Sequence, residues 1–215
     1  MEIAWYGHSC FRINIKKKAS VVCDPYDHTL VGYESLKLKA DIVTTSHDSS
    51  QHRNLKAIKG VPYVISGPGE YEVGGVFITG LRTDKRMKNG HDLPVNTLYL
   101  IDYFGITIVH LGNMTHVPTQ TEVESLGPVH VALVPVGGGG SLPAGKASEV
   151  ISLFEPNIVI PMHYATDAST AELDPIGKFL KVMGLSTVET QSSLTISKPE
   201  SLPDETQVIV LDYSH

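Results

Sequence analysis

The chain has 215 residues, of which 41% are hydrophobic, so it is long enough to bury the core of one large domain. Its 17 basic and 23 acidic residues give a formal net charge of -6, which argues against a general surface for nucleic acids or anionic membranes. The first residues lack the apolar core of a signal peptide, and no apolar run reaches the roughly 18 residues of a membrane-spanning helix. Cys10 and Cys23 each lie in an apolar alternating run, which favours reduced, buried thiols. Together these features predict a cytoplasmic protein with no nucleic-acid or membrane partner.

The first half of the sequence predicts mostly β-strands, because β-branched and aromatic residues recur in short runs separated by Gly, Pro and Asn. The expected strands are residues 2–6, 10–15, 20–25, 41–45, 62–66, 75–80, 96–103 and 105–112, with the lysines of 16–18 in a turn. One helix is possible after His52. The segment 67–75 is rich in Gly, and we expect it to be a turn that exposes Glu70 and Glu72 to solvent.

The second half alternates helical and strand patterns. Apolar residues at helical spacing predict helices over 119–127, 144–156 and 169–184. The expected strands are residues 130–136, 157–163, 186–190, 193–197 and 206–213. Two sheet-rich halves with intervening helices predict one domain, residues 1–215, built as a β-sandwich with helices on both outer faces.

Polar clusters containing histidine follow several of the expected strands. A rigid sheet fixes where such a loop begins, so strand ends are common places for ligand residues. The clusters hold His47 and His52, then His110, Asn113 and His116, and finally His163. Each histidine taken singly fits a structural role, but as a set they could meet in one shared site.

The motif "GHSCF" contains His8 and Ser9. It lacks the second glycine of a nucleophile elbow, and Ser9 lies between two strands, which argues against a serine hydrolase. His8 is expected to be a hydrogen-bonded structural residue.

The segment Gly140 to Lys146 has the glycine and lysine spacing of a phosphate-binding loop. Ala147 stands where such a loop needs Ser or Thr, and Pro143 removes a backbone donor. We interpret it as a strand-to-helix turn that lets the backbone approach a site.

Taken in order, these motifs resemble the metallo-β-lactamase superfamily, in particular its small single-domain zinc-dependent hydrolases related to L-ascorbate-6-phosphate lactonase-like proteins. The resemblance spans nearly the whole chain and includes the motifs "WYGHSCFRI", "CDPYD", "SHDSSQH", "HLGN", "VPVGG" and "IPMHY". It implies a four-layer αβ/βα sandwich with a two-metal hydrolytic site at the edge where the sheets meet.

Several ligand positions implied by the resemblance carry other residue types here. His47, His52 and His163 occupy ligand positions, whereas Ser49, Gln51 and Asn113 stand where a histidine and two aspartates belong. The remaining histidine would fall within residues 83–86, where the sequence is "TDKR". Lys85 or Arg86 could place a fixed cation where a metal would otherwise lie.

Loss of the acids makes a two-metal centre unfavourable, because carboxylates normally offset the repulsion between two close zinc ions. Glutamine cannot accept a proton from water, and amide oxygens bind zinc poorly. We therefore expect no cofactor and a vestigial site in which Ser49, Gln51 and Asn113 donate to the histidines. The leading hypothesis is a non-catalytic protein that binds an unknown small molecule or protein. The alternatives are a hydrolase of lactones, esters or phosphoesters, with one zinc or other divalent metal held by His52 and His163, and a purely structural assembly unit.

Overall fold

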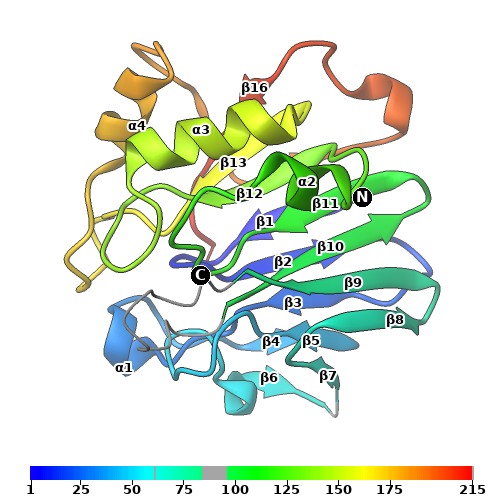
Figure 1. Cartoon of the computed structure of the whole chain (residues 1–215). Coiled ribbons are helices and arrows are strands. Elements are labelled where there is room, and N and C mark those ends of the chain that lie inside the picture. The colour runs from blue at the N-terminus through cyan, green and yellow to red at the C-terminus, as the bar shows by residue number, and fades with distance from the viewer. Residues whose placement is uncertain (61, 84–95, 215) are drawn as a thin grey trace, which may run out of the picture.

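The computed structural model describes residues 1–60, 62–83 and 96–214 and contains two large sheets (Figure 1). The first sheet has the order β15-β1-β2-β3-β5-β7, where the strands are β1 (Glu2–Trp5), β2 (Phe11–Asn14), β3 (Val21–Cys23), β5 (Ile42–Thr44), β7 (Tyr63–Ile65) and β15 (Leu194–Thr195). The second has the order β16-β13-β12-β11-β10-β9-β8, where the strands are β8 (Gly69–Val73), β9 (Val76–Arg82), β10 (Thr97–Tyr103), β11 (Ile106–His110), β12 (Val131–Pro135), β13 (Ile158–Met162) and β16 (Gln207–Val208). Short pairs also form between β4 (Leu38–Lys39) and β6 (Ile58–Lys59) and between β14 (Thr190–Gln191) and β17 (Val210–Leu211).

The main hydrophobic core lies between the two large sheets. Alternation along β1 and β2 turns Ile3, Trp5, Phe11 and Ile13 into this core, where each is at most 1% exposed. Residues of both sheets belong to the same buried cluster. The predicted sandwich is therefore confirmed, and its two sheets share one core.

Helices cover the outer side of the second sheet, as Figure 1 shows. They are α2 (Gln120–Glu124), α3 (Ala144–Phe154) and α4 (Ile176–Val182). The strands β12 and β13 are buried along their whole length, as expected for parallel strands covered on both faces. Helix α3 buries Ala147, Val150, Ile151 and Phe154, which recur at helical spacing.

The outer side of the first sheet is covered differently. A second buried cluster joins Val22 and Val43 of this sheet to Cys10, just before β2, and to loop residues that include Tyr26 and Tyr33. The helix in this layer is the short α1 (His28–Val31), and a 3₁₀ turn forms at Leu55–Ala57. A second 3₁₀ turn, Pro199–Ser201, follows β15. Within the described residues, no helix is long and apolar enough to cross a bilayer.

Four predictions for individual segments were wrong. The strand expected over residues 186–190 is not formed, apart from Thr190, which belongs to the short β14. Residues 169–175 are not helical, because Pro175 has an extended backbone and α4 begins only after it. The helix considered after His52 is a single 3₁₀ turn. The segment expected to be an acidic turn contains β8, where Glu70 and Glu72 face solvent while Tyr71 packs against the core.

The strand directions explain why distant loops meet. The strands β1, β3 and β5 run in the same direction, since β2 is antiparallel to both β1 and β3, and β3 is parallel to β5. In the second sheet β11, β12 and β13 are parallel. Loops that leave the carboxyl ends of parallel strands emerge at one edge of a sheet, and such edges commonly hold binding sites.

Candidate metal centre

Three buried imidazoles converge at the edge of the sandwich. His8 lies in the loop between β1 and β2, His52 lies in the loop after β5, and His163 directly follows β13. One ring nitrogen from each lies within 4.8 Å of the others. The ring centroid of His8 is 4.4 Å from that of His163 and 5.0 Å from that of His52, and the ring centroids of His52 and His163 are 6.2 Å apart. We call these residues the three-histidine site.

The backbone is strained at this site. The backbone at His8, Asp24 and His163 has left-handed φ values of 49°, 45° and 52°, which residues other than glycine rarely adopt. Such strain persists only where the surroundings enforce it, and it is concentrated at functional sites. Here the amide of His163 donates to the carbonyl of His8 at 2.9 Å, which ties the two loops together.

The glycine-rich turn after β12 reaches the same place. The amide of Gly137 donates to the carbonyl of His163 at 3.0 Å, and a β-carbon at position 137 would collide with that oxygen. Glycine is therefore required for this close approach. The interpretation of the turn as one that brings backbone to a site agrees with this arrangement.

Hydrogen bonds orient two of the three imidazoles. The Nδ1 of His52 lies 2.9 Å from Oδ2 of Asp24, whose carboxylate also accepts from the amide and hydroxyl of Ser46. The Nδ1 of His163 lies 3.0 Å from Oγ of Ser141. With both Nδ1 atoms engaged, the Nε2 atoms are the ones that could act as ligands.

The third imidazole lacks partners of its own. Both ring nitrogens of His8 are buried and have no hydrogen-bond partner within the described residues. A buried polar group without a partner is costly, so its place among two other imidazoles requires an explanation. A bound cation would satisfy it, because a metal accepts lone pairs from all three rings at once. Three neutral histidines are a known ligand set for zinc.

The protonation states suit such a role. Burial, followed by repulsion from His52, lowers the pKa of His163 to about 3. Burial, and then the neighbouring His163 and His52, holds the pKa of His8 well below its usual value. Both rings are therefore neutral at pH 7, the form in which histidine binds metals. Burial raises the pKa of Asp24, but the charge of His110 and hydrogen bonds from His52 and Ser46 outweigh it and lower the pKa overall.

The structure brings together only part of the residues predicted from the sequence. His52 and His163 meet, while His47 is half-buried with its ring centroid 5.9 Å from that of His52 and lies outside the three-histidine site. Gln51 is exposed. His110 points elsewhere, with its Nε2 2.9 Å from the carbonyl oxygen of Ser9.

The predicted donors do not account for the orientation of His52 and His163. In the described part of the chain Asp24 and Ser141 are bonded to these two rings, and Oγ of Ser49 has no hydrogen-bond partner. Lys85 and Arg86, considered as substitutes for a metal charge, lie outside the described residues.

Sequence reasoning assigned His8 to a structural role and did not consider Asp24 or Ser141. One signal was available for His8, since it directly follows a glycine at the end of the first expected strand. Asp24 directly follows β3 in the structure, but it falls inside the strand expected over residues 20–25, so its place at a strand end was not marked. Nothing in the local sequence marks Ser141.

The architecture and this histidine cluster define a metallo-β-lactamase fold. The sequence matches the Beta-lactamase superfamily domain over residues 2–163, and the chain belongs to this superfamily. It is 34% identical to a Thermotoga maritima protein whose crystal structure is described as that of a zinc-dependent hydrolase of the metallo-β-lactamase superfamily. The comparison covers 98% of this chain and 97% of the other, with a TM-score of 0.78.

Sequence relatives carry similar names. The chain is 27% identical over 192 residues to a UPF0173 metal-dependent hydrolase of Thermoplasma acidophilum, which covers 77% of this chain and 84% of the relative. It is 25% identical over 201 residues to a UPF0173 protein of Pyrococcus furiosus, covering 81% of this chain and 87% of the relative.

Proposed function

We propose that this protein is a metal-dependent hydrolase in which His8, His52 and His163 hold one zinc or similar divalent ion. The observation that carries the proposal is the convergence of three buried imidazoles whose ligand nitrogens lie within 4.8 Å of one another. Relatives named as metal-dependent hydrolases support it. The sequence-based hypothesis of a non-catalytic protein becomes the second candidate.

One ion accounts for this site better than two. A second divalent ion would need carboxylates to offset the repulsion from the first. The amides Gln51 and Asn113 stand where the family resemblance implies acids, and Asp24 is already bonded to His52 and Ser46. Three histidines match the protein ligand set of a catalytic mononuclear zinc.

The chain's own residues prepare the site for hydrolysis. Asp24 accepts the Nδ1 proton of His52, and Ser141 bonds Nδ1 of His163, so the available lone pairs face the centre of the cluster. Burial of all three rings limits access of bulk water. A metal held there would supply Lewis acidity, polarising a substrate oxygen and lowering the pKa of a water molecule. We propose lactones, esters or phosphoesters as substrates, within a lactonase-like branch of the superfamily.

A non-catalytic role has one specific observation in its favour. Among the described residues, Asp24 is the acid bonded to the three-histidine site, and its oxygens are already occupied by His52 and Ser46. A hydrolase commonly uses an unengaged carboxylate as a general base. A protein that binds a small molecule or a protein partner through this site would not need one.

Metal content and hydrolysis measured together test the two candidates. The protein would be purified from zinc-supplemented medium, and its zinc would be counted by elemental analysis. Hydrolysis of p-nitrophenyl acetate, a simple lactone and bis-p-nitrophenyl phosphate would then be assayed before and after chelation, with His163→Asn as the matched site variant. About one zinc per chain and hydrolysis that chelator removes and zinc restores would support the hydrolase. Bound zinc without turnover would favour the second candidate, and absence of zinc would overturn the metal site.

Replacing Asp24 by asparagine is expected to lower zinc affinity about 10- to 100-fold, the usual effect of losing a carboxylate behind a histidine ligand. The backbone N–H of Ser46 would donate to the side-chain oxygen of the asparagine, so the asparagine NH₂ group would face Nδ1 of His52. Because an NH₂ group donates, Nδ1 would have to accept and the imidazole proton would move to Nε2. The Nε2 lone pair needed by the metal would then be lost. Asparagine tolerates the left-handed backbone of position 24.

Competition with a chromophoric chelator would measure this affinity. Asp27→Asn is the matched control, because Asp27 is a half-buried acid that caps α1 and lies outside the three-histidine site. Unchanged affinity in Asp24→Asn would show that Asp24 does not orient a metal ligand.

A further inference from the structure

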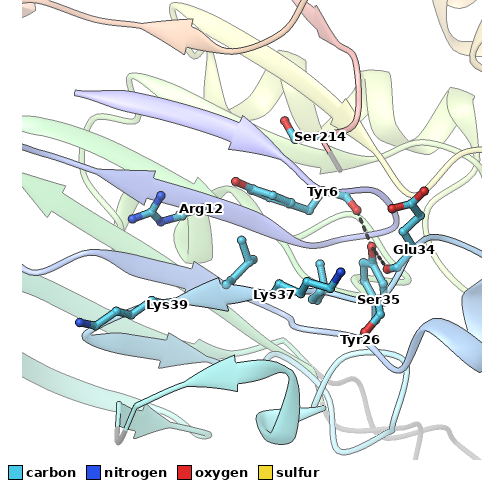
Figure 2. Close-up of a pocket in the computed structure, with 10 residues that line it drawn as sticks. Tyr6, Arg12, Tyr26, Glu34, Ser35, Lys37, Lys39 and Ser214 are labelled. Carbon is cyan, nitrogen blue, oxygen red and sulfur yellow. Dashed lines mark hydrogen bonds between the residues drawn. The ribbon is translucent and has the colours of Figure 1, made fainter.

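A pocket of about 490 Å³ opens on the outer side of the first sheet, between β2 and the chain that leads into β4 (Figure 2). Its volume falls in the range of about 300 to 1,000 Å³ that is usual for small-molecule sites. None of the histidines of the three-histidine site is among its lining residues. The pocket is therefore separate from the three-histidine site.

Cations gather on the walls of this pocket. Arg12, Lys37 and Lys39 line it together with one carboxylate, that of Glu34. Figure 2 shows Arg12 on β2 and Lys39 on β4 at the same end, while Lys37 and Glu34 lie toward the other end. The end formed by Arg12 and Lys39 thus presents two positive charges to one region of the pocket.

The guanidinium of Arg12 supplies independent evidence for a ligand. Its Nε is buried and has no hydrogen-bond partner among the described residues. Asp41, an acid attracted to Arg12, already accepts from the amide and hydroxyl of Ser20 at 2.8 and 2.7 Å. These hydrogen bonds lower the pKa of Asp41, and its attraction to Arg12 and Lys39 is a lesser effect. A buried guanidinium donor without a partner is what a carboxylate or phosphate oxygen would satisfy.

Beside Ser35 and Ser214, part of the remaining wall is apolar. Leu36 and Leu38 line it, and so do the rings of Tyr6 and Tyr26. The hydroxyl of Tyr26 donates to the carbonyl of Tyr6 at 2.6 Å, which fixes its ring against the sheet. Figure 2 shows the ring of Tyr6 extending toward the end that holds Arg12. An apolar wall beside a cationic end suits a ligand with an apolar body and one anionic group.

We propose that this pocket is a second binding site, which takes a small organic anion with an aromatic or aliphatic body. Arg12 and Lys39 pair with its carboxylate or phosphate, and Tyr6 and Tyr26 pack against its body. The proposal does not depend on the hydrolytic function, since the pocket and the three-histidine site have no lining residue in common with each other.

Calorimetric titration of the full chain after exhaustive chelation tests the proposal, because any anion bound through a metal is then excluded. The probes are phenyl phosphate, benzoate and inorganic phosphate. We expect phenyl phosphate or benzoate to bind, and the tighter of the two identifies the anionic group. Inorganic phosphate should bind at least about tenfold more weakly than phenyl phosphate, because it lacks the apolar body.

Matched variants locate the binding. Arg12→Gln should weaken the tighter probe about tenfold or more, and Lys39→Gln should weaken it severalfold. Lys181→Gln, which removes an exposed lysine on α4, should leave it unchanged. Lys39 is exposed, so its replacement tests the pocket without disturbing the core even if Arg12→Gln lowers the melting temperature. The proposal would be overturned if neither phenyl phosphate nor benzoate bound. It would also be overturned if the wild type, Arg12→Gln and Lys39→Gln bound the tighter probe with equal affinity.

Discussion

Replacement of His8 by asparagine is expected to weaken zinc binding by more than about 100-fold, beyond the effect of losing an orienting partner behind a ligand. The change removes one of three imidazoles and leaves an amide oxygen, which is a poor ligand for zinc. Asparagine is chosen because position 8 has a φ of 49°, and asparagine tolerates this conformation better than alanine does. The dissociation constant would be measured by calorimetric titration in competition with a chelator of known affinity.

A second variant controls for effects on zinc binding that would follow from removing any histidine. His28→Asn removes an exposed imidazole at the start of α1, outside the three-histidine site, and should bind zinc as the wild type does. Circular dichroism of His8→Asn should confirm that it folds. If this folded variant kept the affinity of the wild type, His8 would not be a ligand and the mononuclear site would be wrong.

The metal-free protein should lose stability as the pH falls from 7 to 5. The pKa of His163 is about 3 in the folded chain against 6.5 for an ordinary histidine, so between these values the unfolded chain binds the additional proton. Stability rises with pH wherever the unfolded state binds more protons, so acidification favours unfolding. For His163 alone the loss between pH 7 and pH 5 is about 2 kcal/mol.

Urea denaturation in the presence of chelator, at pH 7 and pH 5, measures this loss. Other groups also titrate in this range, so the informative quantity is the difference between wild type and His163→Asn. The variant should show a pH dependence smaller by about 2 kcal/mol. An identical pH dependence in His163→Asn would mean that His163 is protonated equally in the folded and unfolded chains.

Much of the fold could be predicted from local patterns. The buried runs at β12 and β13 and the helical spacing of α3 are strong signals, because each reflects its own burial and needs no knowledge of distant residues. The early part of the third predicted helix failed because its apolar spacing competed with the backbone restriction imposed by Pro175. The strand β8 was missed because glycines surround a segment that pairs with β9 only in the folded sheet.

The site was harder to predict, because its members are joined by tertiary structure alone. His52 and His163 could be placed at strand ends, and the structure confirms that they meet. The inclusion of His8 depends on the direction of β1 relative to β3 and β5 and on the hydrogen bond from the amide of His163 to the carbonyl of His8. A sequence pattern contains neither. The resemblance to a known ligand pattern also drew attention to Ser49 and Asn113 rather than to a histidine outside that pattern.

The origin of the three histidines in both sheets has a consequence for biosynthesis. His8 and His52 lie in loops that follow strands of the first sheet, but His163 follows β13, which is next to the edge strand β16 of the second. Chains emerge from the ribosome at about 5 to 20 residues per second, so the first two imidazoles are exposed to the cellular milieu seconds before the third. A nascent chain can offer at most a weak two-histidine site until β13 has docked against the rest of the second sheet. Metal acquisition is therefore coupled to completion of the sandwich, and a chain truncated before His163 would be both incompletely folded and unable to retain an ion.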